Sequence, residues 1–463
     1  MGATIMQTKV SRILVAAFVL PLVGCNPDEI LEVRDPDIVL PEALSGAQAI
    51  PTIYNGALGD FAVAYNSSTG DAQVSTVGLM TDEFFHSGTF PTRQEFERRT
   101  SNTVNGTLLD VFRNLHQGRR ALENAAEFIK ANGGTPLSAT DAARTAEMHS
   151  LAGFTYVFAA ENYCSGMPYS KVEGGDLLYG GPQTTTQSLD LAIQHFDSAL
   201  AYAAQAASAT QERLARVGKA RAQLNKADFA GAAATANPVP TNFVYRVFHS
   251  ITSARQENSL HSLQFVQRRW SLAHNEGVNG LGFRALDGVG AGTNPAQGDP
   301  RIPWSRRTGA TGIGFDQSSP LFDQLKYNAR NAPTPVADGV EARLIEAENA
   351  LRLGNTANWL SILNTLRSTV SGLAPLADPG TATARENLHF KERAFWLFGT
   401  AHRLGDLRRL VRQYGRAANT VYTTGVYFKG GSYGNDQSLP IPFEEQNNPQ
   451  FTESPDCQNR TAN

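Results

Sequence analysis

The chain has 463 residues and a formal net charge of −3, from 40 Lys and Arg against 43 Asp and Glu. Hydrophobic residues make up 41% and charged residues 18%, which supplies a sizeable core and excludes wholesale disorder. The balanced charge argues against a surface that binds nucleic acid over the whole protein. Only three cysteines occur, without a CxxC pair, so a disulfide scaffold and a cysteine-based zinc site are excluded.

The first 24 residues have the pattern of a lipoprotein export signal. A basic start precedes the apolar run Ile13–Val23, which is shorter than the about 20 residues that span a bilayer and fits a signal peptide. The run ends in LVGC (Leu22–Cys25), which resembles the bacterial lipobox. We expect Cys25 to receive several acyl chains, palmitate among them, and residues 25–45 to form an extended leader. An ordinary cleaved signal and a buried apolar strand are the alternatives.

From Ala47 onward, apolar residues recur at steps of three and four, which indicates helices. After a helix that starts near Ala47, this periodicity predicts further helices over residues 104–131, 142–163, 186–207, 210–224, 226–235, 340–353, 359–370 and 383–414. Residues 64–106 read as loop around short pieces. The segment 236–335 is rich in Pro, Gly, Asn and aromatics and reads as a loop-rich functional insert. The tail, 417–463, is expected to hold short strands, turns and coil.

The middle of the chain resembles the tetratricopeptide pattern, in which small residues lie where paired helices cross. The runs AIQHFDSAL and ARVGKARAQLNKADFAGAAATA carry it, although plain helical hairpins give a similar pattern. We therefore predict a mainly α protein: a tetratricopeptide-like scaffold of helical hairpins with a long loop-rich insert, all within one unit over residues 46–463. The scaffold helices occupy about 104–235 and 340–414.

Three segments resemble one family, the SusD/RagB nutrient-uptake lipoproteins. Glu392–Leu410 (ERAFWLFGTAHRLGDLRRL) is similar to the family's C-terminal helix signature, although Thr400-Ala401 replaces the usual Glu-Gly. Leu439–Glu453 (LPIPFEEQNNPQFTE) is similar to its closing turn, and Asp338–Asn355 to a helix with an Arg-Leu-x-Glu-Ala-Glu core. The lipobox and the helical middle occur in the expected order.

The resemblance implies a SusD-like fold and an outer-membrane lipoprotein exposed at the cell surface. Such a protein captures an oligosaccharide, or in some branches a peptide, and delivers it to a SusC-like TonB-dependent transporter. It implies no catalysis and no cofactor. Two other functions stay open: a tetratricopeptide-like scaffold lipoprotein that binds proteins of the envelope, and an exported glycan hydrolase.

Sugar binding requires flat apolar faces with planar polar groups at their rim, and two loops supply both. Aromatic residues in Gly- and Asn-rich loops are not needed to fill a helical core; their alternative role is to pack the loops onto the scaffold or to face the transporter. The ligand-binding candidates are Asp82, Phe84, Phe85, His86, Phe90 and Arg93 in the first loop, and Trp270, Arg301, Trp304 and Tyr327 in the insert.

Charged motifs give weaker signals. Asp406 lies three residues from both Arg403 and Arg409, which favours ion pairing within a helix over an anion site. Asp82-Glu83 is a carboxylate pair, but adjacency does not set the spacing of about 5 to 9.5 Å that glycosidases use. HExxH, GxSxG and GxxxxGK[ST] motifs do not occur, and the nine histidines are scattered, so no metal site is expected.

Two cysteines remain once Cys25 is assigned to lipidation. Export places the protein in an oxidising compartment, where a bridge is favoured over two free thiols. We therefore predict a Cys164–Cys457 disulfide that ties the tail to the end of the helix predicted over 142–163.

Overall fold

The computed structural model describes residues 45–67, 71–173 and 175–463, so the predicted signal and the lipidation site Cys25 lie outside the described residues. These residues form fourteen α-helices and ten short strands, and the mainly α fold class is confirmed. The helices are α2 (Ile50–Asn66), α3 (Gln73–Met80), α4 (Pro91–Arg98), α5 (Gly106–Asn132), α6 (Ala139–Asn162), α7 (Thr185–Gln205), α8 (Ala209–Asn225), α9 (Phe229–Ala236), α10 (Ser259–His261), α11 (Gly339–Arg352), α12 (Thr356–Ser368), α13 (Ala382–Trp396), α14 (Arg403–Arg412) and α15 (Pro455–Gln458). The strands are β1 (Phe84–His86), β2 (Met167–Pro168), β3 (Lys171–Glu173), β4 (Asp176–Leu178), β5 (Pro182–Gln183), β6 (Val244–Val247), β7 (Trp270–Leu272), β8 (Trp304–Arg306), β9 (Phe322–Gln324) and β10 (Thr334–Asp338).

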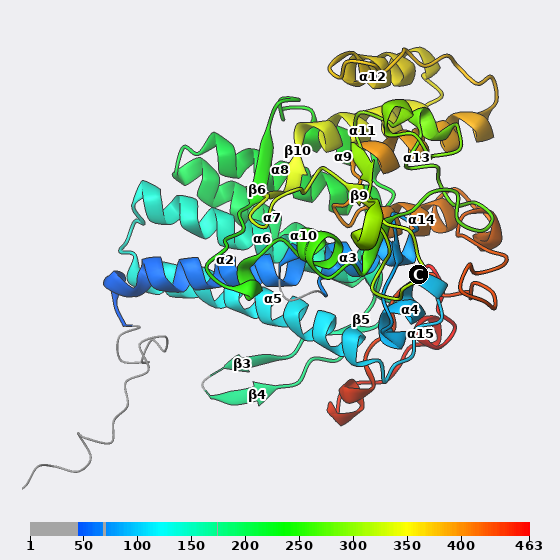
Figure 1. Cartoon of the computed structure of the whole chain (residues 1–463). Helices are drawn as coiled ribbons and strands as arrows, with labels where there is room; N and C mark the ends of the chain where they lie inside the picture. The colour runs from blue at the N-terminus through cyan, green and yellow to red at the C-terminus, as the bar shows by residue number, and fades with distance from the viewer. Residues whose placement is uncertain (1–44, 68–70, 174) are drawn as a thin grey trace, which may run out of the picture. The chain divides into compact units, whose positions relative to one another are not determined.

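The scaffold is a stack of helices that pack against one another (Figure 1). Helix α5 packs on α2 and α6, α7 on α6 and α8, and α11 on α8, α9 and α12. Polar caps begin these helices: Asn105 accepts a 3.0 Å hydrogen bond from Leu108 N, and Ser138 accepts one of 3.1 Å from Asp141 N. Gly46–Asn463 form one compact unit. None of the helices in the described segments is long and apolar enough to cross a membrane.

Small residues at the helix crossings allow close packing around a phenylalanine of α7. The Phe196 ring is fully buried between α6 and α8. A methyl group added to Gly153 would lie 2.8 Å from this ring, and one added to Gly218 would lie 2.2 Å from it. Larger residues would therefore force the helices apart. The predicted alternation of small and large residues is confirmed.

The single helix predicted over 383–414 is wrong, because α13 and α14 are separate helices. Between them Gly399 and Ala401 have left-handed φ angles of 65° and 59°, which a continuous right-handed helix does not contain. Residues far away in the chain bind the freed backbone groups. Gly399 N donates to Glu83 Oε1 over 2.9 Å, and the Tyr327 hydroxyl donates to Gly399 O over 3.0 Å.

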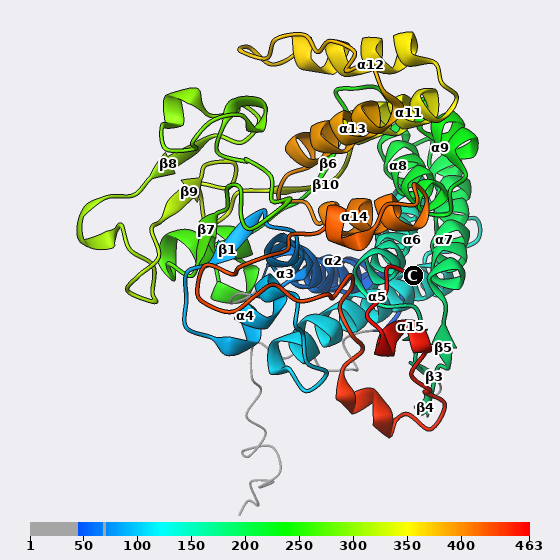
Figure 2. The same cartoon turned by 90° about the vertical axis from the view of Figure 1, so that its right-hand side faces the viewer.

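The insert is loop-rich as predicted, and its short strands form antiparallel pairs. β6 pairs with β10, β8 with β9, and β7 with β1 from the first loop. Figure 2 shows β1, β7, β8 and β9 on one side of this unit and the stacked helices α7 to α9 on the other. The segment 64–106 contains more regular structure than predicted. It includes the helix α3, all of whose residues are buried. The β1–β7 pair thereby joins the two loops that carry the predicted ligand-binding residues.

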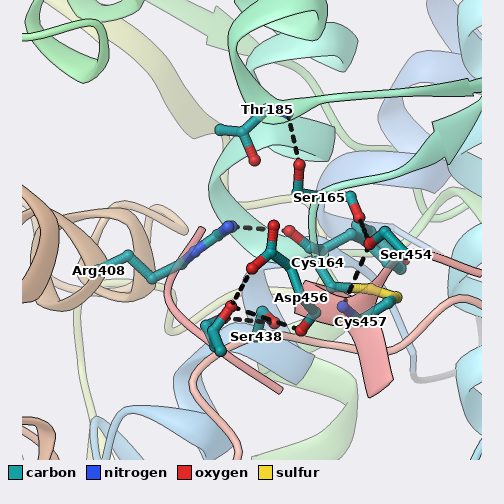
Figure 3. The surroundings of a disulfide bond; sticks show 10 residues. Cys164, Ser165, Thr185, Arg408, Ser438, Ser454, Asp456 and Cys457 are labelled. Atoms are coloured by element: carbon teal, nitrogen blue, oxygen red, sulfur yellow. Dashed lines mark hydrogen bonds between the residues drawn. A yellow bond between two sulfur atoms is a disulfide. The ribbon is translucent and has the colours of Figure 1, made fainter. Parts of the chain in front are cut away.

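The tail is fixed to the scaffold by the Cys164–Cys457 disulfide (Figure 3), so the predicted bridge is confirmed. Around it, Cys164 N donates to Leu439 O over 2.9 Å, and Ser165 N donates to Asn463 O over 3.0 Å. The Ser454 hydroxyl also donates to Ser165 O. In place of the predicted strands, the described tail contains isolated bridges, short 3₁₀ turns and α15.

The charged cluster of the C-terminal signature forms buried ion pairs. Asp406 Oδ2 accepts from Arg393 Nε over 2.8 Å, and its Oδ1 accepts from Arg409 over 2.7 Å. The structural interpretation is confirmed, but one partner differs: Arg393 of α13 takes the place expected for Arg403. The pair spans the break between α13 and α14, which sequence spacing within one helix does not predict.

Candidate functional site

A groove of about 720 Å³ opens where three segments far apart in the chain meet. The first loop, the insert and the tail each contribute to it. Its lining residues are Phe85, Gly88, Thr89, Gln94, Glu276, Arg284, Asp316, Ser318, Ser319, Pro320, Phe322, Phe428 and Lys429. Ligand sites in proteins are concave and combine apolar surface with a few polar groups, and this groove has both.

Aromatic rings supply the flat surface of the groove. The Phe428 side chain is 50% exposed, and its ring lies 5.3 Å from that of Phe85 in an edge-on arrangement. Phe85 itself is only 6% exposed, so the Phe428 ring packs against a buried neighbour. An exposed ring that is held by a buried one keeps its orientation, which favours stacking with a planar or pyranose face.

Polar groups lie at the rim of these rings. Lys429 Nζ forms a 2.7 Å ion pair with Asp316 and also donates to the backbone oxygen of His86. The guanidinium of Arg284 lies 3.4 Å from the centre of the Phe322 ring. These groups and the lining serine hydroxyls are of the type that binds sugar hydroxyls.

A half-buried carboxyl forms part of the groove's polar lining. Burial, and then the neighbouring Asp82, raise the pKa of Glu276 to about 8. The Tyr433 hydroxyl donates to Glu276 Oε2 over 3.0 Å. Glu97 lies nearby, fully buried, and its Oε2 accepts from the Tyr427 hydroxyl over 2.7 Å. Glu276 is therefore largely protonated and uncharged at neutral pH.

Three of the predicted ligand-binding residues lie in the core beneath the groove. Phe84, His86 and Trp270 are fully buried on the paired strands β1 and β7. The Phe84 ring packs 5.2 Å from that of Phe398, and the His86 ring lies edge-on at 5.4 Å from Trp270. Burial lowers the pKa of His86 to about 2, so the ring is neutral. These side chains join the loops to each other.

The other predicted residues of the insert also have protein partners. The Trp304 indole N–H donates to Arg284 O over 2.9 Å, and the Tyr327 hydroxyl holds the α13–α14 break. Arg301 pairs with Asp299 over 2.7 Å and with Glu392 over 2.8 Å, and its side chain is 2% exposed. Each of these groups stabilises the packing of the insert on the scaffold.

The last three predicted residues belong to the first loop. Asp82 is buried and accepts a hydrogen bond from the Thr423 hydroxyl, and burial raises the pKa of its carboxyl to about 6. Arg93 is buried and pairs with Asp71 over 2.8 Å. Phe90 is 45% exposed, and the Arg269 guanidinium lies 4.2 Å from its ring centre.

Of the ten predicted residues, the structure places Phe85 in the lining of the groove and the other nine outside it. Eight of these nine, all except Phe90, have buried side chains, and packing, the alternative that the sequence left open, accounts for them. Ligand contact by any of the ten stays a prediction. The residues that sequence reasoning missed are Glu276, Arg284, Phe322, Phe428 and Lys429. The run GVYFKGGSYG in the tail is aromatic and Gly-rich like the two loops, and this composition could have identified Phe428.

Comparisons with known proteins by sequence and by structure give different results. By sequence, neither a family model nor a curated protein matches the chain. By structure, a SusD superfamily protein from Parabacteroides distasonis superposes with a TM-score of 0.63 at 14% identity, over 88% of this chain and 98% of that one. A SusD-like protein from Bacteroides fragilis gives 0.62 at 13% identity, over 90% and 98%. The chain has the SusD-superfamily fold. A laminarin-binding SusD-like protein also superposes, with a TM-score of 0.55 at 15% identity over 89% and 99%.

A second cavity, of about 380 Å³, lies on the helical side of the SusD-like fold between α2, α6 and β6. The hydroxyls of Tyr54 and Tyr245 donate to the two oxygens of Glu147 there, over 2.7 Å and 2.6 Å. Its walls combine aliphatic residues with the rings of Tyr54, Phe61, Tyr245 and Phe248. The carboxylate of Glu147 at its polar centre already has hydrogen-bond partners within the protein. The groove therefore fits the chemistry of sugar binding better than this cavity does.

Within residues 45–67, 71–173 and 175–463, no group of three or more His, Cys, Asp or Glu side chains could hold a metal ion. The adjacent carboxylates Asp82 and Glu83 do not line the groove. Glu83 is buried and accepts from Gly399 N, and burial raises the pKa of its carboxyl to about 7. Both acids thus serve loop structure in the described fold.

Proposed function

We propose that the chain is a member of the SusD/RagB family that captures oligosaccharides at the cell surface. The observation that carries the proposal is the groove, in which the exposed Phe428 lies against Phe85 with polar side chains around both rings. Structural relatives support it, since one is described as laminarin binding and another, from Bacteroides vulgatus, as carbohydrate binding. Both are carbohydrate binders with the same fold.

The proposed role includes a membrane anchor and a transporter partner. Cys25 would carry the lipid that holds the protein on the outer membrane, and the chain would pass its ligand to a SusC-like TonB-dependent transporter. The lipobox-like LVGC supports the anchor. Metabolic labelling with a palmitate analogue tests it: label in the wild type and none in Cys25→Ala is expected, whereas equal label in both would overturn the anchor.

Capture without cleavage is the proposed chemistry. Purified protein on an array of plant and microbial oligosaccharides should retain at least one class of glycan. After overnight incubation, chromatography of that glycan should show unchanged chain length. Shortened products would support a hydrolase instead, and retention of no glycan would contradict the proposed function.

A further inference from the structure

Two arginines, Arg284 in the lining of the groove and Arg306 beside it, lie close to one aromatic ring. Arg284 and Arg306 both approach the Phe322 ring, with their guanidinium carbons 3.4 Å and 5.9 Å from its centre. Within the described segments, neither side chain forms an ion pair or a hydrogen bond. The other basic residues here differ: Lys429 pairs with Asp316, and Arg307 forms two 2.8 Å hydrogen bonds with Asp323.

The Arg284 guanidinium is also poorly satisfied. Its Nε and Nη1 atoms are buried, and the described residues offer them no hydrogen-bond acceptor. Arg284 nevertheless lines the groove. A buried guanidinium without an acceptor is costly to a protein, and two like charges on one ring repel each other. A bound anion would remove both costs.

The nearest acid does not supply that anion at neutral pH. Burial lowers the pKa of Arg284 to about 10, opposed by the nearby Glu276 and reinforced by Arg306, so the guanidinium stays charged at pH 7. Glu276 keeps its proton there, since its pKa is about 8. The groove is therefore locally positive, although the chain as a whole has a net charge of −3.

We propose that the groove selects acidic oligosaccharides, and that a carboxylate of the ligand binds to Arg284 and Arg306 while a neighbouring sugar ring stacks on Phe428. The inference rests on the proposed function and names its substrate class. Guanidinium binds carboxylate through two parallel hydrogen bonds, which gives geometric selectivity as well as affinity. To reach the ligand, the Arg284 side chain would turn from the Phe322 ring toward the groove.

Pairs of ligands that share a backbone test this inference. The full chain is titrated calorimetrically with oligogalacturonates and with their methyl esters, with alginate oligomers and with their carboxyl-reduced forms, and with sulfated and desulfated galactan oligomers. We expect a carboxylated member to bind at least tenfold more tightly than its neutral partner, and higher ionic strength to weaken that binding.

Substitution of the two arginines tests whether they cause the tighter binding of carboxylated ligands. Arg284→Gln and Arg306→Gln should each weaken carboxylated ligands about ten- to hundredfold, with neutral ligands unchanged. If Arg284→Gln lowers the melting temperature, Arg284→Lys, which keeps the charge but not the guanidinium geometry, is compared instead. Arg255→Gln is the matched control, because Arg255 is an exposed arginine that lines the second cavity.

The outcomes distinguish failure of this inference from failure of the proposed function. Equal affinity for neutral and acidic partners, with Arg284→Gln unaffected, overturns the inference and leaves glycan capture standing. Preference for the sulfated members alone overturns the assignment to carboxylate. Binding of none of these glycans and none on the array contradicts the proposed function itself.

Discussion

Removal of the Cys164–Cys457 disulfide, by the double substitution Cys164→Ser and Cys457→Ser, should lower the free energy of unfolding markedly. The two cysteines are 293 residues apart, so the bridge closes a loop that contains most of the protein. For a loop of this length the chain-entropy model gives a stabilisation of about 5 to 6 kcal/mol, of which bridges commonly deliver about 2 to 4. We therefore expect a loss of about 2 to 5 kcal/mol.

The folded structure should survive this change, because backbone hydrogen bonds also hold the tail. Cys164 N donates to Leu439 O and Ser165 N to Asn463 O, over 2.9 and 3.0 Å. Urea unfolding followed by circular dichroism measures the effect, with the wild type in reductant as a second route to the open form. The variant should have a lower midpoint and the far-ultraviolet spectrum of the wild type.

Two results would contradict this role of the disulfide. An unchanged urea midpoint in the double variant would mean that the bridge does not restrict the unfolded chain. Quantitative alkylation of Cys164 and Cys457 in the exported, unreduced protein would mean that the bridge does not form.

Two further predictions concern buried charge. Glu392→Ala should cost about 3 kcal/mol in urea unfolding, because it removes one carboxylate from two buried arginines, Arg301 and Arg367, each of which keeps an aspartate partner. The control Glu386→Ala breaks the partly exposed Arg416–Glu386 pair and should cost under about 1 kcal/mol. Equal losses would contradict the assignment. The second concerns pH. Burial and a neighbouring carboxylate raise the pKa of Glu276 from 4.5 to about 8, so the folded state holds a proton that the unfolded state has lost. This residue's contribution to stability therefore falls as pH rises from about 4.5 to 8. Glu276→Gln should flatten the measured pH dependence in that window, and an unaltered profile would show that Glu276 titrates normally.

The helices of the scaffold were predictable because their periodicity is local. The α7 pattern, with Phe196 between small residues of α6 and α8, is visible in the sequence itself. The break between α13 and α14 was not, since it depends on Glu83 and Tyr327, which lie far away in the chain. Apolar periodicity continues across the break and so conceals it.

The site was harder to predict, because composition does not distinguish a ring that packs a loop from one that binds a ligand. Trp270 lies in a loop-rich segment, yet its strand pairs with β1 and it becomes core. Phe428 lies in a tail assigned to coil, yet folding places it in the groove beside Phe85. Only the three-dimensional meeting of loop, insert and tail separates the two cases.

Capture at the groove depends on the exposed Phe428 ring, so glycan affinity with and without that ring is the deciding measurement. Calorimetric titration of the best-retained glycan would compare the wild type with Phe428→Ala, and with Phe248→Ala as the control, since Phe248 is 80% exposed and lines the second cavity. Phe428→Ala should weaken binding about tenfold or more, as expected for an aromatic anchor, with an unchanged melting temperature. Phe248→Ala should leave the affinity unchanged. Wild-type affinity in Phe428→Ala, or an equal loss in Phe248→Ala, would contradict capture at this groove.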